Sequence, residues 1–230
     1  MKYFRFLLIT FLSLSLANPV LEARPTKDEF IEVEPLPHLS KQLKAKTVSK
    51  RIQDTQKREA LTLSKAKGVV GEEVAREHME KVSEGRIVSL FTHFEAMGCD
   101  IKSSVRGNGD QGLDDIFVFL NKKGQIDRKS PPIFHEAKYN SKCQFRLNTT
   151  ETIGEQLSRP WIRHNLNHTT TVKFCFPDDS QKQVRSCSKC DKRFERDIQW
   201  IQTQFDNKTF LRTASLLCAN GKLKFYKVND

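Results

Sequence analysis

The stretch LDDIFVFLNKKGQIDRKSPPIFHEAKY, residues 113–139, places two apolar runs on either side of a polar connection. Both runs are rich in Ile, Phe and Val, which are favoured in strands, and the connection contains Gly124. The pattern predicts two antiparallel strands joined as a hairpin. The second run also carries Glu136 and Lys138 two residues apart, although buried strands usually exclude charge.

The spacing of these charged residues predicts a chemical site. Alternate side chains of a strand share a face, so Glu136 and Lys138 should point the same way. Asp114 and Asp115 in the first run point to opposite faces, so one of them should lie across from Glu136. Two close carboxylates can hold a hard divalent cation such as Mg²⁺, which polarises a phosphoryl oxygen and activates water. Lys138 would position or deprotonate that water, or neutralise charge in the transition state.

An acid two residues before a lysine is by itself a weak signal, because most such pairs are solvated charges. The chain contains four of them: Asp100/Lys102, Asp127/Lys129, Glu136/Lys138 and Asp206/Lys208. Only the third lies in a strongly apolar run that follows a glycine-rich turn, an aspartate and another strong strand. This context favours a catalytic interpretation for Glu136 and Lys138 alone.

The N-terminus has the pattern of an export signal. Lys2 and Arg5 precede the apolar run FLLITFLSLSLA, which is shorter than a membrane span, and small residues follow. We therefore expect a signal peptide over residues 1–23 and a secreted or periplasmic protein without stable membrane insertion after cleavage. Residues 24–60 are proline-containing and then Lys-rich, which predicts a linker and an exposed helical arm. Residues 61–230 are expected to form one domain with a cysteine-containing C-terminal extension.

The order of predicted elements indicates the fold class. Helix-like periodicity over residues 64–82 precedes several strands, a helix near 149–166, a strand over 169–176, a helix over 190–205 and two final strands around Asn220-Gly221. A weaker strand is predicted over 99–105. This order predicts an α/β domain with a mixed central sheet flanked by helices.

The net charge is unevenly distributed along the chain. Of the formal +11, residues 121–230 carry +10, so the basic surplus lies in the half that contains Glu136 and Lys138. The surplus fits either a solvated surface or a polyanionic partner, nucleic acid or anionic lipid.

Six cysteines occur in the chain: Cys99, Cys143, Cys175, Cys187, Cys190 and Cys218. An even number in an exported protein favours disulfides, of which 15 complete pairings exist. A zinc site built from Cys175, Cys187, Cys190 and Cys218 is the alternative, although a second CxxC is missing.

Three segments together resemble the PD-(D/E)xK nuclease superfamily, in its branch of small toxin-like and restriction-like enzymes: GNGDQGLDDIFV, IFHEAKY and GEQLSRPWI. The resemblance covers about residues 66–165 and implies a restriction endonuclease-like core with Mg²⁺ or Mn²⁺ as the cofactor. Leu113 stands where the family usually has proline. The implied catalytic residues are Glu72, Asp114, Glu136, Lys138 and Gln156, with Asp114 and Glu136 as metal ligands. Residues near the site that could contact nucleic acid are Lys142, Arg146, Arg159, Trp161 and Arg163.

These features predict an exported metal-dependent nuclease of low sequence specificity that cuts DNA, with RNA as the alternative polymer. Export suggests a toxin, an effector or a scavenging enzyme, and the sequence identifies no inhibitor protein. The competing hypothesis is a non-catalytic basic module that binds nucleic acid or anionic surfaces. The nuclease requires Asp114, Glu136 and Lys138 to converge at one end of adjacent strands, whereas the binding module leaves them scattered.

Overall fold

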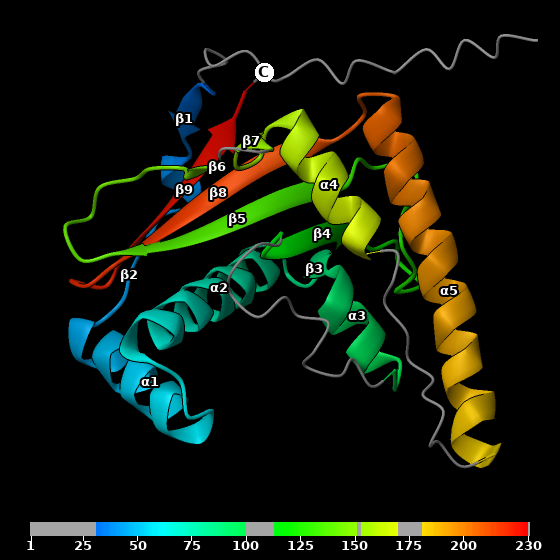
Figure 1. The fold of residues 1–230 in the computed structure, drawn as a ribbon, viewed down its shortest axis with the longest axis horizontal. Coiled ribbons are helices and arrows are strands. Elements are labelled where there is room, and N and C mark those ends of the chain that lie inside the picture. Colours follow the sequence, from blue (N-terminus) through cyan, green and yellow to red (C-terminus); the bar gives the residue numbers. More distant parts are fainter. Residues whose placement is uncertain (1–30, 100–112, 151–152, 170–180, 230) are drawn as a thin grey trace, which may run out of the picture.

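A computed structural model of the chain describes residues 31–99, 113–150, 153–169 and 181–229. They form a seven-stranded mixed sheet flanked by helices, which confirms the predicted α/β class (Figure 1). The helices are η1 (Pro37–Leu39), α1 (Ala45–Arg58), α2 (Leu63–Val82), α3 (Leu90–Ala96), α4 (Arg159–Thr169) and α5 (Gln181–Asp206). The strands are β1 (Val33–Pro35), β2 (Lys41–Gln42), β3 (Ile87–Ser89), β4 (Asp115–Phe119), β5 (Ile133–Asn140), β6 (Thr149–Thr150), β7 (Gly154–Glu155), β8 (Leu211–Cys218) and β9 (Lys222–Val228).

The main sheet has the strand order β1-β9-β8-β5-β4-β3, and β2 also pairs with β9. The predicted β4–β5 and β8–β9 hairpins are both present and antiparallel, while β5 and β8 pair in parallel. The second hairpin turns at Gly221, where φ is +84° and an added Cβ would lie 2.2 Å from the Leu43 carbonyl oxygen. Only glycine meets both requirements without strain.

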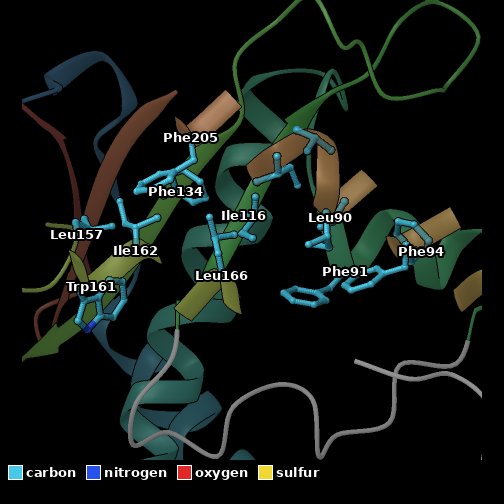
Figure 2. Close-up of a cluster of buried hydrophobic side chains, with 14 of the residues drawn as sticks. Leu90, Phe91, Phe94, Ile116, Phe134, Leu157, Trp161, Ile162, Leu166 and Phe205 are labelled. Atoms are coloured by element: carbon cyan, nitrogen blue, oxygen red, sulfur yellow. The ribbon is translucent and has the colours of Figure 1, made fainter. Parts of the chain in front are cut away.

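Each face of the sheet is covered by its own hydrophobic core. Helices α3, α4 and α5 pack over one face, and α1 and α2 pack over the other. Figure 2 shows the first core, in which Phe134 of β5 and Ile116 of β4 lie with Ile162 and Leu166 of α4. Alternate residues of β5 divide between the cores, because Phe134 belongs to the first and Ile133 to the second.

Residues 31–58, expected to be a linker and an exposed arm, pack instead onto the sheet and α2. Strand β1 pairs with β9, and Val48 and Ile52 of α1 are 1% and 5% exposed against α2. With Thr55 they follow the i, i+4, i+7 spacing of a helix stripe. This buried stripe is narrow, and the rest of the segment is rich in lysine. The composition therefore suggested an exposed helix, although the spacing of the stripe residues allows one face of the helix to be buried.

The segment before α4 also differs from the helix that was predicted to begin near residue 149. Residues 149–150 and 154–155 form the short β6–β7 pair, and α4 begins at Arg159 with Pro160 in its first turn. Proline fits a first helical turn, where its missing N–H is not needed. The predicted signal peptide lies wholly outside the described residues. The strands predicted over residues 169–176 and 99–105 lie mainly outside them.

Two disulfides join four of the six cysteines, in agreement with the expectation of disulfides. Cys99 bonds to Cys190 of α5, and Cys143 bonds to Cys218 at the end of β8. These bonds exclude the four-thiolate zinc alternative, because two of its proposed ligands have other partners. Cys175 and the side chain of Cys187 lie outside the described part of the chain. The disulfides are compatible with an extracellular protein, and no helix among the described residues is long and apolar enough to cross a bilayer.

Candidate active site

The β4–β5 hairpin brings Asp114 beside the two charged residues of β5. Asp115 pairs in register with His135, so Asp114, just before β4, reaches the neighbourhood of Glu136. The Asp114 Oδ2 atom accepts a hydrogen bond of 2.6 Å from the backbone N–H of Ala137. This bond fixes the Asp114 carboxyl against the middle of β5.

Asp115, the competing aspartate, is fully engaged elsewhere. Its Oδ2 accepts a 2.6 Å hydrogen bond from Arg76 Nε of α2, and its Oδ1 accepts one of 2.6 Å from Ser89 Oγ. Asp115 is only 3% exposed. The neighbouring aspartates therefore differ in role: Asp115 ties β4 to α2 and the end of β3, and Asp114 alone faces the site.

The Glu136 carboxyl is the centre of the arrangement and is 2% exposed. Its Oε1 accepts hydrogen bonds from Lys138 Nζ at 2.5 Å and from Gln156 Nε2 at 2.6 Å. Its Oε2 is buried and has no hydrogen-bond partner among the described residues. A buried carboxylate oxygen without a partner is costly, so this atom requires a proton or a cation.

Gln156 is held so that its amide nitrogen points at Glu136. The Gln156 Oε1 accepts a hydrogen bond from the backbone N–H of Asn148 at 2.9 Å, and the Gln156 N–H donates to the Asn148 carbonyl at 2.9 Å. Because the oxygen of the side-chain amide is already used, the nitrogen is left to donate to Glu136. Gln156 is thus clamped by the loop that follows β5.

Glu72 approaches the same region from α2. Helix and strand come close at Gly71, where an added Cβ would lie 3.6 Å from the Lys138 carbonyl oxygen. Burial, followed by the charge of Asp114, raises the pKa of Glu72 to about 8, while Arg76 opposes the shift. Glu72 therefore lies close enough to Asp114 for the two carboxyl groups to resist joint ionisation.

The pKa values of the other two carboxyl groups of the site are also raised. Burial raises the pKa of Asp114 to about 6, against the opposing effects of Lys138 and the Ala137 N–H. Burial and then Asp114 raise the pKa of Glu136 well above its ordinary value, and Glu72 adds to this. A divalent cation between Asp114 and Glu136 would relieve this repulsion and give the unpartnered Oε2 a ligand role.

The donor set fits Mg²⁺ or Mn²⁺ held by two carboxylates. Within the described ranges, no three His, Cys, Asp or Glu side chains are arranged to hold one metal ion. Mg²⁺ commonly uses only one or two protein carboxylates and completes its shell with water and substrate phosphate. Asp114 and Glu136 are sufficient for such a site, and Glu72 lies beside it.

His135, next to Glu136, points to the opposite face and is structural. It is 1% exposed, and its ring nitrogens lie 2.8 Å from Thr213 Oγ1 and 3.0 Å from Ser215 Oγ. Burial, with a smaller contribution from Arg76, lowers the pKa of His135 to about 3. The ring therefore stays neutral and joins β5 to β8.

The residues predicted to contact nucleic acid differ in their exposure and in the contacts that their side chains make. Lys142 and Arg146 are exposed on the loop after β5, which the Cys143–Cys218 bond holds against the sheet. On α4, Arg159 lies over the Phe210 ring, and Arg163 pairs with Asp206 at 2.8 Å.

Trp161 was predicted to contact nucleic acid, and the structure contradicts this prediction. Its side chain is 2% exposed in the first core, so it cannot stack on a base (Figure 2). A large aromatic on the inward stripe of an amphipathic helix packs into the core instead.

Arg76 is a residue that the sequence reasoning missed. It follows Glu72 by one helical turn, and its ion pair with Asp115 is 2.6 Å long. The i, i+4 spacing of Glu72 and Arg76 on α2 is the signal that could have identified it. Its charge opposes the raised pKa values of both Glu72 and Asp114.

Comparisons of the chain with protein-family models, curated proteins and solved structures give no match. The geometry of Asp114, Glu136, Lys138 and Gln156 is therefore the basis on which a function can be assigned.

Proposed function

We propose that this protein is a metal-dependent nuclease with a restriction endonuclease-like core, which hydrolyses phosphodiester bonds with low sequence specificity. The observation that carries the proposal is the convergence of Asp114, Glu136, Lys138 and Gln156 around a buried carboxylate oxygen that has no hydrogen-bond partner among the described residues. These side chains come from three separate segments of the chain. A module that only binds polyanions has no need for such a buried acidic cluster.

Asp114 and Glu136 would hold the Mg²⁺ or Mn²⁺ ion. A cation bound there lowers the pKa of a coordinated water and polarises a phosphoryl oxygen. The Ala137 N–H fixes the Asp114 carboxyl, and Gln156 fixes the Glu136 carboxyl, so the two ligands are preorganised.

Lys138 supplies the positive charge that the reaction needs beside the ligands. Its ammonium group is held 2.5 Å from Glu136 Oε1, and its side chain is 19% exposed, so the side chain is partly accessible to solvent. From this position it can donate to the attacking water or to a non-bridging phosphate oxygen. The same charge stabilises the additional negative charge of the transition state.

The polymer contacts in the proposal are electrostatic. Lys142 and Arg146 stand exposed on the disulfide-held loop beyond β5 and can contact phosphates. Contacts of this kind position a strand without reading its bases. DNA is the expected substrate and RNA the alternative, in an exported toxin, effector or scavenging enzyme.

The test is a cleavage assay on the purified protein with its disulfides intact. Supercoiled plasmid DNA and structured RNA are each incubated with Mg²⁺, Mn²⁺ or EDTA. Glu136→Gln and Lys138→Ala should each lower the metal-dependent rate by about 100-fold or more. Lys129→Ala is the matched control, because Asp127 and Lys129 have the same spacing outside the site.

Three results would decide against the proposal. Cutting that persists in EDTA would exclude the metal-dependent mechanism. Equal rates for Glu136→Gln and the native protein would remove the site from the chemistry. Binding of either polymer without any cutting, in a folded protein supplied with metal, would favour the non-catalytic binding module.

A further inference from the structure

The loop of residues 141–148 connects β5, which carries Glu136, with the short β6–β7 pair. It leaves the end of β5 and returns toward β7 and the start of α4 (Figure 1). Its last residue, Asn148, donates its backbone N–H to Gln156 Oε1, and its carbonyl accepts from the Gln156 backbone N–H. The position of this loop therefore decides which way the Gln156 amide faces.

The backbone and the side chain of Gln156 are held by different parts of the fold. The next residue, Leu157, is fully buried, and its carbonyl accepts a 3.0 Å hydrogen bond from Arg212 Nη1 of β8. These contacts fix the main chain where α4 begins. The side-chain amide depends on Asn148, because an amide whose oxygen has lost its donor can rotate and present that oxygen to Glu136.

The β6–β7 pair is too short to hold Asn148 by itself. Each of its strands has two residues, and Asn148 and Gln156 follow at the open end of the pair. An isolated pair of strands is at best marginally stable in water. The position of Asn148 therefore depends on the loop residues that precede it.

These preceding residues are anchored through side chains rather than through the backbone. Within the described part of the chain, the backbone of residues 144–147 makes no hydrogen bond. Phe145 stacks on Tyr226 of β9 with ring centroids 4.3 Å apart, and Leu147 is buried in the first core. The covalent anchor is the bond from Cys143 to Cys218 of β8.

The disulfide sets the direction in which the loop starts. Cys218 is fully buried and pairs in register with Asn140, the last residue of β5. Bonding to Cys218 turns the chain across β8 within three residues of Asn140, toward Tyr226 of β9. Cys143 has a φ of +58°, which is costly for a residue other than glycine and requires contacts that hold it. Opening the disulfide would release this conformation.

We propose that the Cys143–Cys218 disulfide is a redox-dependent positioning element of the candidate active site. In the oxidised protein it holds the loop across β8, so that Asn148 keeps the Gln156 amide turned toward Glu136. In the reduced protein the loop relaxes and the hydrogen bond from Gln156 to Glu136 is lost, while the sheet remains. The effect on activity rests on the proposed nuclease function, whereas the effect on Gln156 does not.

The reductant in this proposal is a small dithiol. One of its thiolates attacks Sγ of Cys143, the half-buried partner, and Cys218 leaves as a thiolate that takes up a proton. The second thiol of the reductant then attacks the mixed disulfide and releases Cys143. Two electrons pass to the protein, which gains two thiols, and the dithiol becomes a cyclic disulfide. The reverse reaction restores the bond.

The first measurement follows Gln156 directly in the full disulfide-bonded protein by NMR. The side-chain NH₂ signals of Gln156 report its bond to Glu136, and hydrogen exchange of the Asn148 N–H reports its bond to Gln156 Oε1. In Cys143→Ala/Cys218→Ala the NH₂ signals should move to the positions of a solvent-exposed glutamine. Exchange of the Asn148 N–H should become about tenfold faster or more.

The second disulfide provides the matched control. Cys99 and Cys190 are 91 residues apart and Cys143 and Cys218 are 75 apart, so loss of either bond frees the unfolded chain to a similar extent. Cys99→Ala/Cys190→Ala should therefore lower stability comparably but leave the Gln156 signals in place. Should either variant not fold, a dithiol titration of the native protein replaces it: the Gln156 signals should change in step with alkylation of Cys143, measured by mass spectrometry.

The cleavage assay tests whether the disulfide acts through Gln156. Cys143→Ala/Cys218→Ala should lower the metal-dependent rate by about tenfold or more, because partners that orient a metal ligand contribute about 10–100-fold. Gln156→Met should cause a similar loss. Combining the two changes should give no further loss, since both remove the same hydrogen bond.

Three results would overturn the proposal. The first is a Gln156 NH₂ signal that is the same with and without the Cys143–Cys218 bond, whether or not the protein is a nuclease. The second is an equal shift of that signal in Cys99→Ala/Cys190→Ala. The third is a fully additive loss of activity in the combined variant. A native protein that cuts no nucleic acid would instead reject the proposed function, and the NMR comparison would then decide this proposal alone.

Discussion

The carboxyl group of Glu72 offers the most direct test of the electrostatics of the candidate active site. Its pKa is raised from 4.5 to about 8 in the metal-free protein. An acid whose pKa is higher in the folded state binds a proton more tightly there, so stability is lost as pH rises from about 4.5 to about 8. For this one group the linkage relation gives a loss of about 1 kcal/mol by pH 5 and about 4 kcal/mol by pH 8.

Replacing Glu72 with Gln removes this ionisation. In EDTA, Glu72→Gln should therefore be more stable than the native protein by about 4 kcal/mol at pH 8 and by about 1 kcal/mol at pH 5. Urea unfolding at the two pH values, with the disulfides intact, measures the difference. Glu73→Gln is the control: the Glu73 side chain is 35% exposed and 3.6 Å from Arg58, so its replacement should change stability by about 0.5 kcal/mol or less.

The dependence on pH is the decisive part of this experiment. If Glu72→Gln and the native protein are equally stable at pH 8, the Glu72 carboxyl is not buried beside Asp114. A stability gain that is the same at both pH values would show that packing, not ionisation, causes it. Saturating Mg²⁺ at pH 8 should reduce the advantage of the variant, because a bound cation stabilises the native protein with its acids ionised.

Three further predictions concern other parts of the fold. The pKa of His135, about 3, is lower than in the unfolded chain, so the ring should stay neutral from pH 8 to pH 4.5. His135 should therefore lower the stability of the folded protein only as pH falls. An NMR titration midpoint between pH 5 and 7 would contradict its buried position. Gly221→Ala should cost about 2 kcal/mol or more in urea unfolding because its Cβ would clash with the Leu43 carbonyl, whereas Gly85→Ala, at φ +73° in open space, should cost about 1 kcal/mol. Trp161→Ala should cost about 3–5 kcal/mol of stability while the remaining folded protein keeps its affinity for nucleic acid, and a selective loss of affinity would instead restore Trp161 as a contact.

The local elements of the fold were predictable because their patterns are local. The β4–β5 hairpin follows from two apolar runs and a glycine-containing connection, and the β8–β9 hairpin follows from Asn220-Gly221. The parallel pairing of β5 with β8 could not be predicted, since its partners lie 78 residues apart at His135 and Thr213. Nothing in either strand specifies which strand lies beside it.

The central residues of the candidate site could be predicted from the sequence for the same reason. Alternation placed Glu136 and Lys138 on one face, and the hairpin placed an aspartate across from them. Gln156 was identified as a site residue only through the family resemblance. Its hydrogen bonds with the Asn148 backbone depend on the conformation of a loop, which the sequence pattern does not predict.

The pairing of β9 on both sides has a consequence for the timing of folding. Strand β8 lies along one edge of β9, and β1 and β2 lie along the other. Gln42 is hydrogen-bonded to Asn220, 178 residues later in the chain. A ribosome adding about 5–20 residues per second makes the first strands wait roughly 10–40 s for their partner.

During that interval β5, which carries Glu136 and Lys138, also lacks its neighbour β8. The sheet under the candidate site is completed only when residues 211–228, which form β8 and β9, have been added. An assembled sheet beside Glu136 and Lys138 therefore requires synthesis of the chain through β8 and β9, and a product that stops before β8 lacks the strand beside β5.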